Sequence, residues 1–204
     1  MFEPMPAPWS IALAIGISFS HPSDLVIDQP ANGNHATFHN VRWAGQSFVS
    51  PLYYVVRIGK GDVQLDFTHF KMIAEVHESI PVTGTWHGEA VDETAPLGER
   101  VQHLEISHGV NSFALIGLFR DPARRGAYVG AGPLIYLPHA ESTIDGQVNQ
   151  WGYANGGSGV EVLAGVGFPA PFADIKYDAG SVKVGIANGT ASTTVQSLQF
   201  SIAP

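Results

Sequence analysis

The 204-residue sequence has no cysteine and little charge, because Asp, Glu, Lys and Arg together make up only 14% of it. The absence of cysteine excludes a disulfide scaffold and thiolate chemistry. An average globular chain has about 25% charged residues, so this chain has too few for the surface of an ordinary soluble domain. Such a chain either places its surface in lipid or binds something large and apolar.

Long hydrophobic runs are also missing, since no stretch approaches the roughly 20 consecutive apolar residues of a transmembrane helix. The formal net charge of −8 argues against a nucleic acid as a partner. No signal peptide is visible, because the start Met1-Phe2-Glu3-Pro4 has no basic region. This absence counts against export, and if the protein is exported, we expect this chain to be a mature or recombinant form from which the leader has been removed.

The residues that are abundant are those of strands and tight turns, including 23 glycines. The clearest pattern runs from Trp9 to Phe19, where large apolar side chains alternate with small, uncharged ones. A soluble sandwich would carry charges on its outer face. A large apolar face and a small uncharged face instead fit the lipid side and the lumen side of a narrow barrel.

Seven further strands are expected, at about 48–58, 62–77, 101–119, 127–137, 159–168, 172–184 and 193–202. Short connections at 59–61, 120–126 and 169–171 alternate with longer, polar ones at about 20–47, 78–100, 138–158 and 185–192. This alternation is typical of outer-membrane barrels. The sequence predicts an all-β fold, an antiparallel up-and-down transmembrane β-barrel of about eight strands, as one domain over residues 1–204 in a bacterial outer membrane. The alternative is a soluble barrel or sandwich.

Charged residues on the inward face of these strands are expected to form ion pairs in the lumen, since buried charges are normally paired. Arg57 and Asp66 could pair there, and Glu161 is expected to point towards Arg57 or Lys71.

Nine histidines are the least expected feature of the composition. The densest group lies on the predicted strands 62–77, with His69 and His77, and 101–119, with His103, Glu105 and His108. Pairing residue 62 with residue 119 brings His77 close to His103 and Glu105. Imidazoles and carboxylates are therefore predicted to converge at the upper rim of the barrel.

Two kinds of chemistry suit such a group. His77, His103, Glu105 and His108 could bind a divalent transition metal ion. Alternatively, His108 could act as a general base, with Ser107 or Ser112 as the nucleophile and Glu105 orienting the imidazole. Our candidate catalytic residues are His69, His103, Glu105 and His108. The structural alternative is that these histidines bond neighbouring strands and loop carbonyls.

Two stretches, Tyr128-Val-Gly-Ala-Gly-Pro133 and Val162-Leu-Ala-Gly-Val166, together with the alternating C-terminal strand, resemble small outer-membrane barrels of the OmpA-like superfamily. A narrower resemblance, to lipid A oxidase-type barrels, is carried by four segments: Asp66-Phe-Thr-His69-Phe-Lys71, Gly84-Thr-Trp-His-Gly88, Ser107-His-Gly-Val-Asn111 and His139-Ala-Glu-Ser-Thr-Ile-Asp-Gly146. This resemblance implies oxygen-dependent oxidation of the proximal glucosamine of lipid A, helped by a divalent metal ion.

The leading hypothesis is thus a monomeric outer-membrane enzyme that modifies lipid A, with lipopolysaccharide or another outer-leaflet lipid as its partner. One alternative is a non-enzymatic structural or surface-binding barrel. Another is a lipid A deacylase-type hydrolase. The order Ser107-His108-Gly109 counts against the latter, because it does not reproduce the His-x-Ser element of that family.

Overall fold

The computed structural model describes residues 8–106, 109–120, 126–149, 156–167 and 171–204. Within these residues the chain forms fifteen β-strands and two short 3-10 helices, η1 (Pro30–Asn32) and η2 (Leu97–Glu99). The described part of the chain contains no helix that is long and apolar enough to cross a membrane.

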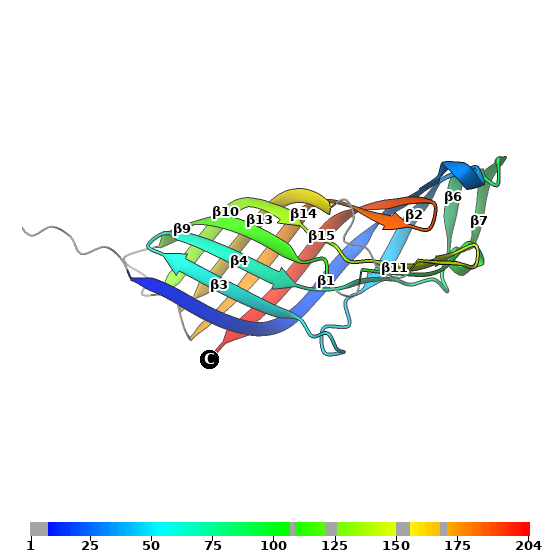
Figure 1. The fold of residues 1–204 in the computed structure, drawn as a ribbon. Coiled ribbons are helices and arrows are strands. Elements are labelled where there is room, and N and C mark those ends of the chain that lie inside the picture. Colours follow the sequence, from blue (N-terminus) through cyan, green and yellow to red (C-terminus); the bar gives the residue numbers. More distant parts are fainter. Residues whose placement is uncertain (1–7, 107–108, 121–125, 150–155, 168–170) are drawn as a thin grey trace, which may run out of the picture.

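Eight of the strands form a closed antiparallel barrel, in which β1 pairs with both β3 and β15 and so completes the ring (Figure 1). In ring order they are β1 (Trp9–Gln29), β3 (Tyr54–Lys60), β4 (Val63–His69), β9 (Ser112–Arg120), β10 (Ala127–Tyr136), β13 (Gly156–Val166), β14 (Phe172–Ile186) and β15 (Gly189–Ala203). Each strand pairs with the next barrel strand along the chain. The predicted up-and-down barrel is therefore confirmed.

The alternation along β1 becomes the two faces of the barrel wall. Ile11 and Leu13 are 75% and 61% exposed on the outside, whereas Ala12 and Ala14 are buried. Large apolar side chains are exposed in the same way around the ring, at Leu65, Leu115, Phe119, Val129, Ile135, Val160, Val166, Ile175 and Ile202. Soluble monomers rarely expose an apolar surface of this extent.

The height of this apolar surface matches a bilayer. From Trp9 to Phe19 the strand advances ten residues, which at about 3.3 Å per residue and a tilt of about 40° gives a height of about 25 Å. That is the height of the apolar band on outer-membrane barrels. The outer wall is thus a lipid-facing surface, and the architecture is that of a bacterial outer-membrane protein.

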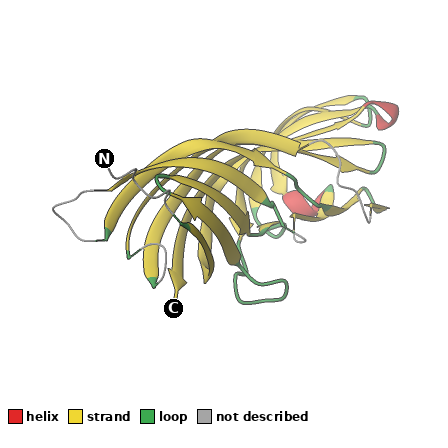
Figure 2. Ribbon diagram, turned by 60° about the vertical axis from the view of Figure 1, so that its left-hand side comes forward, coloured by secondary structure: helices red, strands yellow, loops and turns green. Residues whose placement is uncertain are grey.

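The other seven strands continue the sheet beyond one end of the barrel (Figures 1 and 2). They are β2 (Asn34–Ala44), β5 (Met72–Ala74), β6 (Ser79–Trp86), β7 (Glu89–Pro96), β8 (Val101–Ile106), β11 (Glu141–Ile144) and β12 (Gln147–Asn149). We call these strands, together with the upper halves of β1, β14 and β15, the extension. It stands opposite the short turns, on the side that faces out of the cell in barrels of this kind.

The extension begins where β1 changes partner. β1 pairs with β3 up to Ile15, opposite Tyr54, and with β2 from Ser20, opposite Trp43. The prediction of long polar loops at 20–47, 78–100 and 138–158 was therefore wrong in large part, because most of the described residues there are strands of the extension. Several of these strands, such as β5, β7 and β12, are short or polar, so their partners cannot be read from the sequence.

The predicted strands 62–77 and 101–119 are also each divided in two. β4 pairs with β9 up to Thr68, opposite Ser112, but β5 pairs with β8 from Met72, opposite Ile106. The chain advances four positions from Thr68 to Met72 but six from Ile106 to Ser112. One continuous ladder therefore cannot form. The register predicted for this hairpin was wrong by one residue along β4 and β9, where Ser112 pairs with Thr68 and not with His69, and the break adds a further shift above them.

The interior of the extension is apolar and closely packed. Leu25, Trp43, Leu104, Ile106 and Val182 lie around a gap that has no room for a water molecule. The lower barrel has a different interior, made of buried polar and charged side chains.

Candidate functional site

Arg57 on β3 is the centre of a charged network inside the lower barrel. Its guanidinium donates two hydrogen bonds to the carboxylate of Asp66, at 2.8 and 2.7 Å, and a third to Asp174, at 2.5 Å. The hydroxyl of Tyr128 also donates to Asp174, at 3.0 Å. All four side chains are buried. The structure thus pairs Arg57 with Asp66, and adds Asp174 and Tyr128 from β14 and β10.

Lys176 on β14 is the second cation of this network. Its ammonium lies 3.4 Å from a carboxylate oxygen of Glu161 and 3.7 Å from one of Asp66, and it donates to the hydroxyl of Thr68 at 2.5 Å. β4 and β14 lie opposite each other in the ring of eight strands. Bonds between them therefore cross the lumen.

Lys71, one of the two cations expected near Glu161, lies elsewhere. Its ammonium is buried near the barrel rim and donates to the carbonyl of Val49, at 2.9 Å. Glu161 pairs with Lys176 instead. Leu163 pairs directly with Lys176 and points to the same side of β13 as Glu161, so the ammonium lies within reach of the Glu161 carboxylate.

His69 is the last residue of β4. By the alternation of the strand it is on the same outer face as Val63, Leu65 and Phe67. Its ring stacks on Tyr54 with 5.1 Å between centroids, and its Nδ1 lies 3.1 Å from Oδ1 of Asn111. The turn at Gly109 packs against the same ring and buries it. His69 is thus held at the upper edge of the lipid-facing band.

His103 and Glu105 lie on β8 in the extension, with Nε2 of His103 3.4 Å from Oε2 of Glu105. The β5–β8 register, continued by two residues, places position 75, and not His77, opposite His103. His69 lies on the other side of the break between β4 and β5 from this position. The structure therefore brings His103 and Glu105 together but keeps His69 apart from them.

His77 lies exposed in the turn between β5 and β6, and His108 lies outside the described residues. Among the residues that the structure describes, no three His, Asp or Glu side chains are grouped so that they could hold a metal ion. The convergence of His69, His77, His103 and Glu105 that the sequence predicted is therefore not found in this part of the chain.

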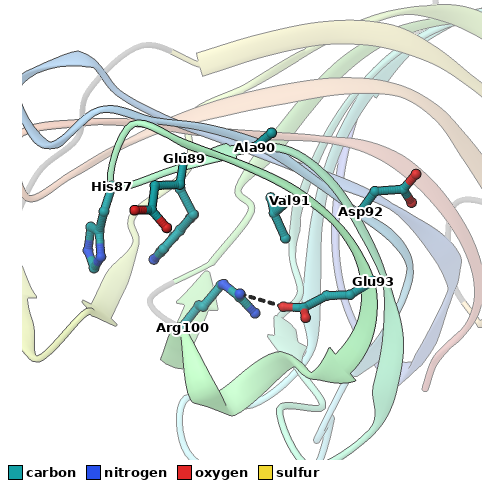
Figure 3. A pocket seen from close by; sticks show the side chains of 8 residues that line it. His87, Glu89, Ala90, Val91, Asp92, Glu93 and Arg100 are labelled. Atoms are coloured by element: carbon teal, nitrogen blue, oxygen red, sulfur yellow. Dashed lines mark hydrogen bonds and ion pairs between the residues drawn. The ribbon is translucent and has the colours of Figure 1, made fainter.

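An open cleft of about 410 Å³ lies along β7 at the far end of the extension (Figure 3). Trp86 and Val91 contribute apolar surface, and Glu89, Asp92 and Glu93 supply carboxylates. Arg100 lines the cleft as well, and its guanidinium is 2.6 Å from the carboxylate of Glu93. The cleft is open to solvent, so a ligand could enter it.

Two tight turns hold this end of the extension together. Backbone φ angles are positive at His87 and Gly88 in one turn and at Asp145 and Gly146 in the other, as type I′ hairpin turns require. The carboxylate of Asp145 accepts hydrogen bonds from Nε1 of Trp86, at 3.2 Å, and from Nδ2 of Asn34, at 3.2 Å. Nε2 of His87 lies 2.8 Å from the same carboxylate.

Replacing Asp145 with alanine is expected to loosen these turns. Losing several acceptor contacts at a half-buried carboxylate costs about 1–3 kcal/mol. The amide of Gly88, which donates to the carbonyl of Gly33 at 3.0 Å, should then exchange its hydrogen about 10- to 100-fold faster. Asp28→Ala, which removes an exposed pair with His35, should leave this rate unchanged. Equal rates in the two variants would contradict the role given to Asp145.

Acidic residues outnumber basic ones strongly on this side of the molecule. The segments 20–53, 70–111, 138–158 and 185–192, which build and connect the extension, contain eleven acidic and three basic residues. Their difference equals the net charge of −8, so the rest of the chain is neutral overall. Sequence reasoning missed the cleft and the acidic character of the extension, although Asp145-Gly146 and His87-Gly88 are visible turn signals.

No family model matches the chain, and no curated protein sequence matches it. Among solved structures, the solid-state NMR structure of the outer membrane protein AlkL in DMPC lipid bilayers aligns with all of this chain and with 93% of that one. The sequence identity is 15% and the TM-score is 0.41. These values are too low to support an argument about function, so the assignments here depend on the molecule's own geometry.

Proposed function

We propose that this protein is a surface-binding outer-membrane protein, in which the barrel is a closed anchor and the extension binds the ligand. The observation that carries this proposal is the charged network of Arg57 and Lys176, which joins opposite walls of the lumen. The cleft beside β7, which is open to solvent, is then a place where a ligand can bind.

Charge indicates the chemistry of that ligand. Glu89 and Asp92 are exposed at the cleft, in an extension that has a large excess of acidic over basic residues. A surface of this sign attracts cationic ligands and speeds their association. We infer that the extension binds a cationic group, such as a lysine-rich segment of another protein or peptide.

A peptide of ten lysines is a suitable probe for the protein in phosphatidylcholine vesicles. Replacing Glu89 and Asp92 with their amides should weaken binding about tenfold, since each exposed ion pair contributes up to about 1 kcal/mol. The control Glu75→Gln with Glu99→Gln removes the same charge at exposed positions that do not line the cleft. It should weaken binding by clearly less. Equal losses would show attraction to the overall charge, and would refute the cleft as the binding site.

Modification of lipid A is a second candidate, which the position of His69 favours. This histidine lies at the upper edge of the lipid-facing band, beside Tyr54 and Asn111. Mass spectrometry of lipid A from cells with and without the protein tests it. If the protein modifies lipid A, the mass of lipid A should differ between the two cell types, and this difference should be absent when the cells carry the His69→Ala variant. Identical lipid A in the two cell types would rule it out and leave the surface-binding proposal intact.

A further inference from the structure

The loop between β2 and β3, residues 45–53, projects from the side of the barrel (Figures 1 and 2). Three of its side chains are large, apolar and exposed: Phe48 (75%), Val49 (54%) and Leu52 (51%). No charged residue occurs from Trp43 to Val56. An apolar loop without charge is unusual in a part of the molecule that is otherwise strongly acidic.

Several hydrogen bonds hold this loop in its shape. The backbone NH of Tyr53 donates to the carbonyl of Ser47, at 2.9 Å, and that of Ser18 donates to Oγ of Ser47, at 3.0 Å. The buried ammonium of Lys71 donates to the carbonyl of Val49, at 2.9 Å. Through these bonds, polar groups of the loop have hydrogen-bond partners inside the protein, while the apolar side chains point outward.

The bond to Ser18 also fixes the height of the loop on the barrel. Ser18 lies between Ile15, the last residue of β1 paired with β3, and Ser20, the first paired with β2. Its neighbour Phe19 is 55% exposed on the outer wall, at the upper end of the apolar band. The loop thus leaves the wall where the band ends, and its apolar side chains continue the lipid-facing surface.

We propose that Phe48, Val49 and Leu52 insert into the outer leaflet of the bilayer that the barrel spans. Apolar and aromatic side chains at the edge of a membrane-spanning surface favour the region between headgroups and acyl chains. The continuity of the loop with the lipid-facing wall favours lipid over a protein as its occupant. An inserted loop would anchor the barrel at the point where β1 passes from β3 to β2, and would fix the extension relative to the membrane surface.

Nitroxide labels attached to single cysteines test this proposal, because the natural chain has no cysteine. Phe48→Cys and Leu52→Cys are labelled in the full chain, shown to be folded by circular dichroism, and reconstituted in phosphatidylcholine vesicles. Collision of the label with oxygen, which concentrates in lipid, is compared with collision with a water-soluble nickel chelate. Ile11→Cys on the outer wall and Glu99→Cys on the exposed extension are the lipid and water references.

The oxygen-to-nickel ratio at positions 48 and 52 should rise well above that at position 99, into the range of position 11. Ratios equal to that at position 99 would place the loop in water and overturn the proposal. Low collision rates with both reagents would show that a second copy or another protein covers the loop, and would overturn it as well. The position of the loop is independent of what the cleft binds.

Discussion

Replacing Arg57 with alanine is expected to lower the free energy of unfolding by about 3–5 kcal/mol. The guanidinium is fully buried and bonds both Asp66 and Asp174, so its removal leaves two buried carboxylates without their nearest cation. An unpaired charge in a buried site costs far more than the pair itself contributes. Denaturant titration of the protein in detergent micelles, followed by circular dichroism, measures the change.

Arg42→Ala is the matched control for this experiment. Arg42 also forms an ion pair, with 2.7 Å between its guanidinium and Glu78, but its side chain is 58% exposed. Exposed pairs contribute at most about 1 kcal/mol. Similar effects of the two replacements would mean that water reaches Arg57, and that the lumen is not closed as described.

Replacing Trp43 with alanine is expected to have a similarly large effect, on the extension. Trp43 is 6% exposed in its apolar core, and its Nε1 donates to Oγ of Ser23, at 2.8 Å. Truncating a buried tryptophan to alanine costs about 3–5 kcal/mol, because it leaves a cavity and, here, also removes a hydrogen bond to the Ser23 hydroxyl. Proteolysis of the reconstituted protein should therefore cut the extension faster in this variant.

Trp9→Ala is the control, since Trp9 lies on the lipid-facing wall and is 68% exposed. It should leave the proteolysis rate of the extension unchanged. If Trp43→Ala protein were as resistant as the Trp9→Ala protein, the extension would not depend on the packed core assigned to it.

The barrel could be predicted from the sequence because its wall separates two media. Lipid outside and a narrow lumen inside require large side chains at Ile11 and Leu13 and small ones at Ala12 and Ala14. This alternation identified all eight barrel strands, although several of their ends were misplaced. The same period-two rule placed Arg57, Asp66 and Glu161 on the inward face.

The extension could not be predicted, because the alternation of buried and exposed residues is weak or too short in several of its strands. β7 (Glu89–Pro96) has no buried residue and β5 has only three residues, so neither shows an alternation of apolar and polar residues from which a strand could be predicted. β1 changes partner between Ile15 and Ser20 through contacts that are distant in sequence. The histidine cluster was predicted from one continuous hairpin, and the break between β4 and β5 separates His69 from His103. Which cation pairs with Glu161 likewise depends on the register of β13 with β14.

The central claim is that the wall from Trp9 to Phe19 separates lipid from a closed lumen, and a nitroxide scan along residues 9–19 in vesicles tests it most directly. The account predicts a period of two. Labels at Ile11, Leu13 and Ile15 should collide with oxygen, and labels at Ala12 and Ala14 should collide little with either oxygen or the nickel chelate. Frequent collision with the nickel chelate at positions 11, 13 and 15 would show a wall in water and contradict a membrane barrel. Frequent collision with it at positions 12 and 14 would contradict a closed lumen.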